Sequence, residues 1–193
     1  MSLGEFFIIL LIVNIIFLST TWLLNKKKGD SNTDFVSQGF SLIVLARSAI
    51  FVNLLFNDTD IKLRQWLITV LVTIWGLKLT LDIFSTKEQK KDLNSDNLSL
   101  DLYLKKVPRR VIFQMLIISP VISVNFLPGP SGLNFLDFMG VLIFSTGLLY
   151  EIYSNKELTH FKSKSTNEQK IFIEGLWSFS RHPNSLGKLI QWW

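Results

Sequence analysis

The sequence predicts an all-α membrane protein that crosses the bilayer several times. Hydrophobic residues make up 48% of the 193 residues and charged residues only 18%, and the apolar residues form long blocks separated by polar segments. Six tryptophans and sixteen phenylalanines are typical of a chain with aromatic side chains at the lipid–water interface. The blocks predict a polytopic helix bundle of five complete spans plus an incomplete sixth, in a single membrane domain covering residues 1–193.

The first apolar run, residues 6–24, contains no charged residue and is long enough to cross a bilayer. A secretory signal would carry positive charge before the run and a cleavage site of small residues after it. Residues 1–5 contain no Lys or Arg, and three lysines follow the run at 26–28 instead. The pattern therefore predicts a retained first helix.

The second run, residues 35–56, is interrupted by Arg47. A charge at that depth should face the interior of the bundle or a polar cavity. Two interpretations are open, an ion pair with an acid such as Asp82 or Asp137 and a contact with a ligand. The residue types favour the ion pair.

The third run, residues 66–84, holds Lys78 and Asp82 four residues apart, which places them on one face of a helix. A polar segment, residues 85–110, follows and is predicted to be a solvated loop with a short interfacial helix over 98–107. Its basic residues lie beside a membrane helix, so they predict contact with anionic lipid rather than with nucleic acid.

Two further runs cover residues 111–126 and 133–153. In the first, Gln114 lies within apolar sequence and needs a hydrogen-bond partner inside the bundle. A sixth apolar segment begins at Leu186 and has only eight residues before the sequence ends. Eight helical residues rise about 12 Å, well short of a bilayer core of about 30 Å.

The distribution of basic residues predicts the orientation of the chain. Residues 85–110 contain seven basic and four acidic residues, and residues 154–185 contain five basic and three acidic. By the positive-inside rule these segments are cytoplasmic and the N-terminus is outside. Residues 181–184 then face the cytoplasm.

Several kinds of site have no support in the composition. The chain has no cysteine, so disulfides and Cys-ligated metals are excluded, and two histidines are too few for a His-rich metal centre. It contains no glycine-rich nucleotide-binding loop. The expected partners are membrane lipid and a lipid-like substrate, with no metal and no nucleic acid.

A group of polar residues, Arg181, His182 and Asn184, surrounds Pro183 just before the last apolar segment. Pro183 has no N–H and disfavours helix at the preceding residue, so a helix is expected to begin at or just after it. Arg181 offers a planar donor fork that suits phosphate or carboxylate, beside a helix N-terminus that favours anions. Residue chemistry alone supports membrane anchoring and ligand binding equally.

One motif resembles the signature of the steroid 5-alpha-reductase C-terminal superfamily, and most closely its bacterial branch of uncharacterised multi-pass proteins. This motif is Gly175-Leu176-Trp177-x-x-Ser180-Arg181-His182-Pro183-Asn184. Sterol reductases and, more distantly, isoprenylcysteine carboxyl methyltransferases are related to it. Upstream groups fall in the order of that branch, among them Trp75-Gly76-Leu77-Lys78-Leu79, Asp137-x-x-Gly140 and Gly147…Glu151. The resemblance covers about residues 34–193.

The resemblance implies a membrane-embedded reductase that uses NADPH to reduce a C=C bond of a steroid-like or isoprenoid lipid. Glu151 and Asn155 share a helix face and predict a polar wall of the cofactor pocket, although an ordinary polar helix end is the alternative. An acid near a helix C-terminus is unfavourable with the dipole, so Glu151 is expected to have a specific partner such as Arg181. The candidate cofactor-binding residues are Glu151, Asn155, Trp177, Ser180, Arg181, His182 and Asn184. The sequence identifies no catalytic acid.

Two alternatives stay open because this chain departs from the family pattern. Ser185 stands where an aromatic is usual and Lys188 where an acid is usual, while Asn155 and Glu157 replace an Asp and a Gln. A methyltransferase of the same superfamily would place S-adenosylmethionine in the pocket, and this smaller ligand fits more easily beside Ser185. A non-catalytic, truncated membrane protein is the other alternative, because family members continue beyond the position of Trp193.

Overall fold

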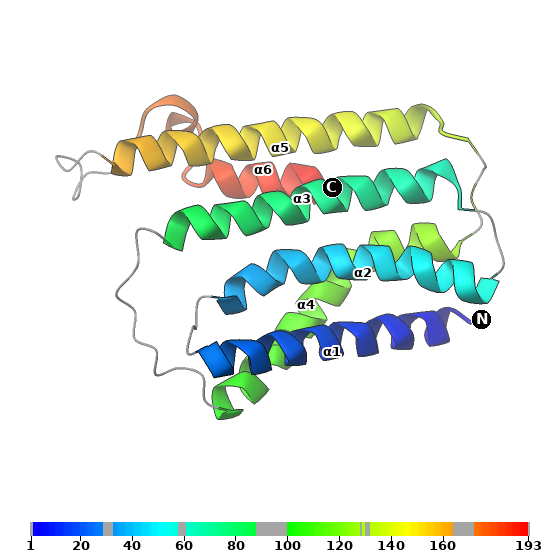
Figure 1. The fold of residues 1–193 in the computed structure, drawn as a ribbon. Helices are drawn as coiled ribbons and strands as arrows, with labels where there is room; N and C mark the ends of the chain where they lie inside the picture. The colour runs from blue at the N-terminus through cyan, green and yellow to red at the C-terminus, as the bar shows by residue number, and fades with distance from the viewer. Residues whose placement is uncertain are drawn as a thin grey trace. The chain divides into compact units, whose positions relative to one another are not determined.

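The regular secondary structure of the described residues is entirely helical, with no strand. The computed structural model describes residues 2–28, 33–57, 61–87, 100–127, 129, 132–163 and 172–192. These residues form six α-helices and a short 3-10 helix. Figure 1 shows the course of the chain through the helices. Their bounds are α1 (Leu3–Lys28), α2 (Thr33–Asn57), α3 (Leu63–Lys87), α4 (Leu100–Phe126), α5 (Phe135–Lys162), η3 (Gly175–Ser178) and α6 (Pro183–Trp192).

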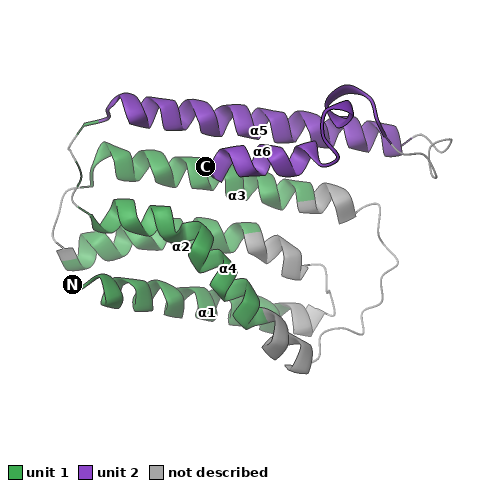
Figure 2. Ribbon diagram, turned by 180° about the vertical axis from the view of Figure 1, so that it is seen from behind, with its two compact units in different colours: residues 1–132 green, residues 133–193 purple. Residues whose placement is uncertain are grey.

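The helices form two compact units, which are described separately here. Residues 1–132 contain α1 to α4, and residues 133–193 contain α5, η3 and α6 (Figure 2). The single domain expected from the sequence stays a prediction.

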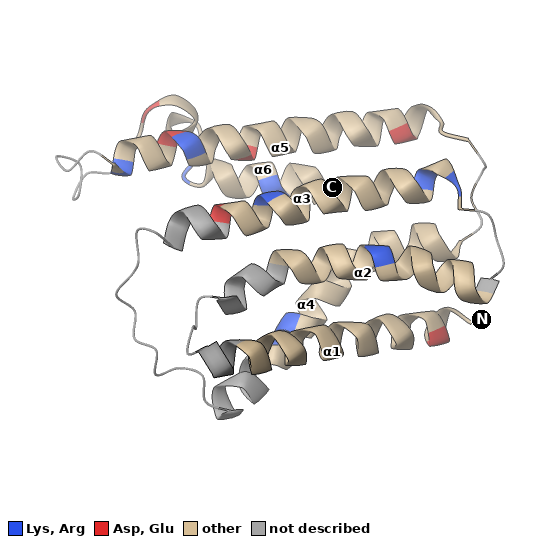
Figure 3. Ribbon diagram, in the orientation of Figure 1, with Lys and Arg blue, Asp and Glu red and all other residues tan. Residues whose placement is uncertain are grey.

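Four helices are long and apolar enough to cross a membrane by length and composition. The apolar stretches are Leu3–Leu24, Gly39–Phe56, Val107–Phe126 and Phe135–Lys162. Uncharged residues, drawn in tan in Figure 3, make up most of each helix. The helix α3 is not among the four, although it has 25 residues. The fold is therefore an α-helical protein with four candidate spans, and the fifth span stays a prediction.

The helix α4 begins earlier than the sequence analysis expected. The apolar run predicted a span over 111–126 after a loop, but the helix is continuous from Leu100 and includes Pro108 and Pro120. The helix predicted over 98–107 is therefore confirmed for residues 100–107, and the loop prediction is wrong for residues 108–110. The short helix expected in this region and the apolar run are one helix, because a polar segment outside the hydrocarbon can continue the backbone hydrogen bonding of a span.

Gln114 of α4, which was predicted to need a hydrogen-bond partner inside the bundle, has one in α2. Gln114 is fully buried, and its Nε2 donates to Ser41 Oγ. Leu42 and Leu45 of α2 and Ile118 of α4, which lie within four residues of Ser41 or Gln114 along their helices, are also buried. The hydrogen bond fixes the α2–α4 pair at a point where packing alone would leave a buried amide unsatisfied.

Replacing Ser41 by alanine is expected to destabilise the protein by about 1 kcal/mol, because the buried Gln114 amide then loses its acceptor. Adding Gln114→Leu should recover most of that loss, since the amide is removed as well. Thermal unfolding in detergent measures both. A double variant less stable than Ser41→Ala would contradict this account of the α2–α4 contact.

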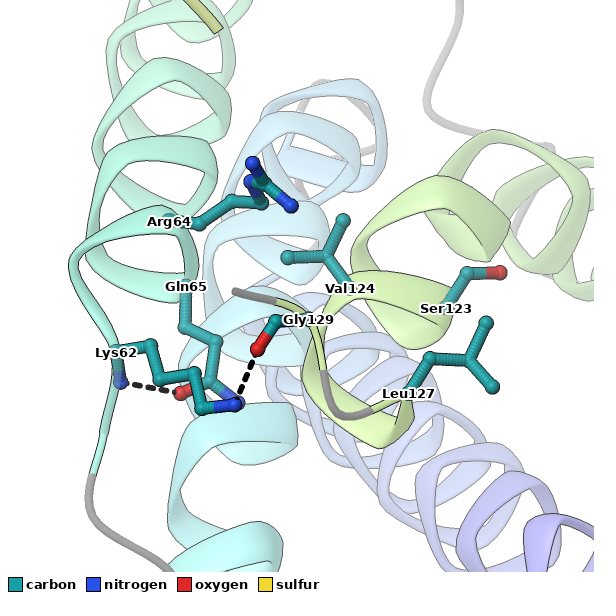
Figure 4. Close-up of a pocket in the computed structure, with 7 residues that line it drawn as sticks. All are labelled: Lys62, Arg64, Gln65, Ser123, Val124, Leu127 and Gly129. Carbon is teal, nitrogen blue, oxygen red and sulfur yellow. Dashed lines mark hydrogen bonds between the residues drawn. The ribbon is translucent and has the colours of Figure 1, made fainter. Parts of the chain in front are cut away.

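The start of α3 and the end of α4 are joined by polar contacts around a small cavity of about 210 Å³ (Figure 4). Lys62 Nζ donates to the carbonyl of Gly129, and Lys62 N donates to Gln65 Oε1 at 2.8 Å. Gln65 is buried, and its Nε2 donates to the carbonyl of Asn125 at 3.2 Å. These contacts bind the segment after α4 to α3.

Candidate functional site

The helix that carries Glu151 has a well-defined start. Asn134 Oδ1 accepts a hydrogen bond from Asp137 N at 3.1 Å, and the Asp137 carboxylate accepts one from Asn134 N at 2.8 Å. This capping box satisfies backbone donors that the first turn of a helix leaves unpaired. Asp137 therefore caps its own helix.

The helix α6 begins at Pro183, as the sequence predicted. The carbonyl of His182 accepts from Ser185 N and Leu186 N, both at 3.1 Å. The buried face of α6 consists of Pro183, Gly187 and Gln191, at a spacing of four residues.

Two glycines bring the backbones of α5 and α6 into direct contact. A Cβ atom on Gly187 would lie 2.7 Å from Glu151 N and 2.9 Å from Glu151 Cα. A Cβ atom on Gly147 would lie 2.8 Å from the carbonyl oxygen of Gly187 and from Gln191 N. Gly187 thus lies against Glu151 and Gln191 against Gly147, so the two helices run antiparallel.

A buried polar cluster lies at this helix crossing. Glu151 is 1% exposed, and its Oε2 accepts from Gln191 Nε2 at 2.8 Å. Lys188 Nζ lies 3.7 Å from Glu151 Oε1. Gln191 Nε2 also donates to the Gly187 carbonyl at 3.1 Å, whereas its buried Oε1 has no hydrogen-bond partner among the described residues.

The sequence correctly predicted a specific partner for Glu151 but not its identity. The predicted partner, Arg181, forms no hydrogen bond or ion pair within the residues that the structure describes. The partners are Gln191 and Lys188, because the glycine contact sets Glu151 against the second turn of α6. No signal in the sequence predicted this pairing, because it depends on the register between the two helices.

The segment before α6, residues 175–177, is held to the turns of α5 that follow Glu151. Gly175 has a φ of +59°, and the Glu157 carboxylate occupies the space that a side chain there would need. Glu157 Oε2 accepts from Leu176 N at 3.2 Å. Glu157, noted in the sequence only as a departure from the family pattern, therefore positions this turn.

An aromatic contact completes the attachment. Trp177 Nε1 donates to the carbonyl of Ser154 at 3.1 Å, and the rings of Phe161 and Phe172 stack with centroids 4.6 Å apart. Phe172 also lies 6.2 Å from Trp177, between ring centroids. Trp177 is thus a structural residue of the turn as well as a candidate site residue.

The remaining candidate residues surround the start of α6. Arg181 and His182 are exposed, whereas Ser180, Asn184 and Asn155 are partly buried. Backbone N–H groups find local acceptors, with His182 N donating to Ser180 Oγ at 3.3 Å and Ser185 N to Asn184 Oδ1 at 2.9 Å. Since Gly187 lies against Glu151, the antiparallel register places Asn155 level with Pro183.

The structure therefore brings the candidate residues into two sets. Glu151 lies at the buried crossing with Lys188 and Gln191, while the motif residues lie at the start of α6 beside Asn155. Within the part of the chain that the structure describes, no group of three His, Asp or Glu side chains could hold a metal ion.

A family model described as a protein of unknown function (DUF1295) matches residues 21–193. The chain belongs to this family. No curated protein and no solved structure matches the chain.

The DUF1295 match covers the whole candidate site and reaches further towards the N-terminus than the residues 34–193 that carry the resemblance. It includes the end of α1 and all of α2 to α6. Membership of this family is consistent with the steroid 5-alpha-reductase-like superfamily.

Proposed function

We propose that this DUF1295 protein is a membrane-embedded reductase that uses NADPH to reduce a C=C bond of a steroid-like or isoprenoid lipid. In this proposal the chain has five complete spans with its N-terminus outside, and the start of α6 faces the cytoplasm. The observation that carries the proposal is the exposed Arg181 at the start of α6, which has no partner in the described structure.

The residues at the start of α6 fit a phosphate-bearing cofactor. Arg181 offers a bidentate donor fork for a phosphate, and the first turn of α6 adds the favourable end of a helix dipole. Lys188, 45% exposed on its side chain, supplies a second positive charge one turn further on. The amides of Asn155 and Asn184 could bind ribose hydroxyls or the nicotinamide carboxamide, since an amide both donates and accepts.

The buried cluster contributes by holding these groups in place. Glu151 holds Lys188 on one side and Gln191 on the other, and the glycine contact leaves α6 no freedom to slide along α5. Direct contact of Glu151 with the cofactor stays a prediction. When bound, NADPH would supply the hydride, and an electron-poor C=C bond is the acceptor that such a hydride needs. The residues of this chain would bind and orient the cofactor.

Replacing Arg181 by alanine is expected to weaken NADPH binding to detergent-purified protein by about tenfold or more, the range for a hydrogen bond to a charged group. Asn184→Ala should weaken it less. Titration with NADPH, followed by cofactor fluorescence, measures both. Arg109→Ala is the matched control, because Arg109 is also an exposed arginine but lies on α4.

The same titration separates the alternatives. Saturable binding of S-adenosylmethionine that is lost in Arg181→Ala, without NADPH binding, would make the protein a methyltransferase. A folded sample that binds neither ligand would indicate that the protein is non-catalytic and that Arg181 anchors α6 at the membrane interface.

A further inference from the structure

The first unit contains a cleft of about 540 Å³ between α2 and α3, lined by a matching stripe of side chains from each helix. On each helix the lining residues follow the spacing i, i+3, i+4 and i+7, which keeps them on one face. Ile50 and Thr69 are buried, and the apolar side chains around them are exposed. The lining residues are Arg47, Ile50, Phe51 and Leu54 from α2, and Trp66, Thr69, Val70 and Thr73 from α3.

The cleft is closed at one end by a close helix contact. A Cβ atom on Gly39 would lie 2.5 Å from the carbonyl oxygen of Gly76, and one on Gly76 would lie 2.7 Å from Ile43 Cγ1. The helices therefore run antiparallel, with backbones touching near Gly39. Arg47 lies one turn beyond Ile43, nearest the closed end, and Leu54 and Trp66 lie at the opposite end.

Arg47 lies at the middle of an apolar span. It is eight residues from Gly39 and nine from Phe56, the two ends of that span, so it lies about 12 Å along the helix from the nearer end. The ion pair predicted for it with Asp82 is wrong, because Asp82 pairs with Lys78 at 2.5 Å, the i,i+4 pair that the sequence did predict.

The guanidinium of Arg47, an exposed residue, has no hydrogen bond or ion pair in the described structure. The other residues that line the cleft are apolar or threonine, and the hydroxyls of Thr69 and Thr73 donate to backbone carbonyls. A charge at this depth in hydrocarbon is costly and marks a functional position unless it is neutralised. An anion in the cleft would neutralise it.

We propose that this cleft binds an amphiphile with a carboxylate on a hydrocarbon body, the carboxylate on Arg47 and the hydrocarbon against Phe51, Leu54 and Trp66. The guanidinium fork matches a carboxylate in two parallel hydrogen bonds. A carboxylic acid can enter hydrocarbon in its neutral, protonated form, whereas a phosphate ester keeps a charge near neutral pH. The head group of a bilayer phospholipid stays at the interface, which lies about 15 Å from the bilayer centre.

This site is independent of the proposed reductase function, because every residue that lines the cleft belongs to α2 or α3 of the first unit. Arg181→Ala should therefore leave it unchanged. Failure of NADPH binding and failure of carboxylate binding are separate results.

The test is fluorescence quenching by a dibrominated stearic acid titrated into the full chain in detergent. Bromine quenches tryptophan on contact, and Trp66 is exposed in the cleft. Saturable quenching of tryptophan fluorescence is expected. The share of that quenching that is absent in Trp66→Phe comes from Trp66 and therefore measures binding in this cleft. Arg47→Leu should weaken binding by about tenfold or more, the range for a charge-assisted pair. Arg109→Leu, which removes an exposed arginine from α4, should bind as the parent does.

Four results would overturn the proposal. The first is the absence of saturable quenching of Trp66, and the second is equal affinity in Arg47→Leu. The third is equal quenching by the methyl ester of the same acid, which would reduce the cleft to an apolar surface without selection for the carboxylate. Lysophosphatidic acid serves as competitor; displacement of the brominated acid at lower concentration than by stearic acid would overturn the choice of carboxylate over phosphate.

Discussion

Replacing Gly187 by alanine is expected to destabilise the α5–α6 pair by about 2 kcal/mol. The added Cβ would lie 2.7 to 2.9 Å from three atoms of Glu151, two of them backbone, so no side-chain rotation relieves the clash. Alanine also favours a helix over glycine by about 1 kcal/mol, which opposes the effect but does not exceed it. Thermal unfolding in detergent, followed by circular dichroism, measures the result.

Gly140→Ala is the matched control, because it makes the same chemical change within α5 where no atom lies within 4 Å of the new Cβ. There the helix propensity acts alone, so this variant should be as stable as the parent or slightly more stable. The two substitutions are therefore expected to act with opposite signs. A Gly187→Ala protein at least as stable as Gly140→Ala would contradict the backbone contact between α5 and α6.

The sequence predicted the helices well where they depend on local signals. The lack of an N–H in Pro183 identified the start of α6, and the spacing of Lys78 and Asp82 identified their ion pair. The start of α4 was missed because the apolar run shows where hydrocarbon contact begins, while the helix itself continues to Leu100 through polar residues. Hydropathy thus locates a span more reliably than it locates the ends of its helix.

The candidate site was predictable in its residues but not in its pairings. Which acid meets which base depends on the register between two helices, and this register is set by the contact of Gly147 and Gly187. Nothing in the spacing of either helix alone places Lys188 beside Glu151. Of the two acids that the sequence offered Arg47, Asp82 and Asp137, the first pairs instead with Lys78 on its own helix.

Replacing Glu151 by leucine is expected to lower the free energy of unfolding by about 2 kcal/mol, the cost of a buried amide that loses its acceptor. The substitution removes the acceptor of Gln191 Nε2, in a side chain that is 8% exposed and already has an unsatisfied Oε1. Lys188 contributes less to the loss, because its half-exposed ammonium can turn to solvent. Chemical or thermal unfolding of the purified variant measures the change.

The double variant Glu151→Leu with Gln191→Leu separates packing from function. A buried polar pair can often be replaced by apolar residues of similar volume without loss of stability, so most of the roughly 2 kcal/mol lost in Glu151→Leu should return. Both the single and the double variant should bind NADPH more weakly than the parent, because Lys188 has no carboxylate in either to hold it beside the start of α6. Recovery of both stability and NADPH affinity would show that the buried carboxylate serves packing alone. Recovery of stability without affinity would tie the buried carboxylate of Glu151 to the cofactor site.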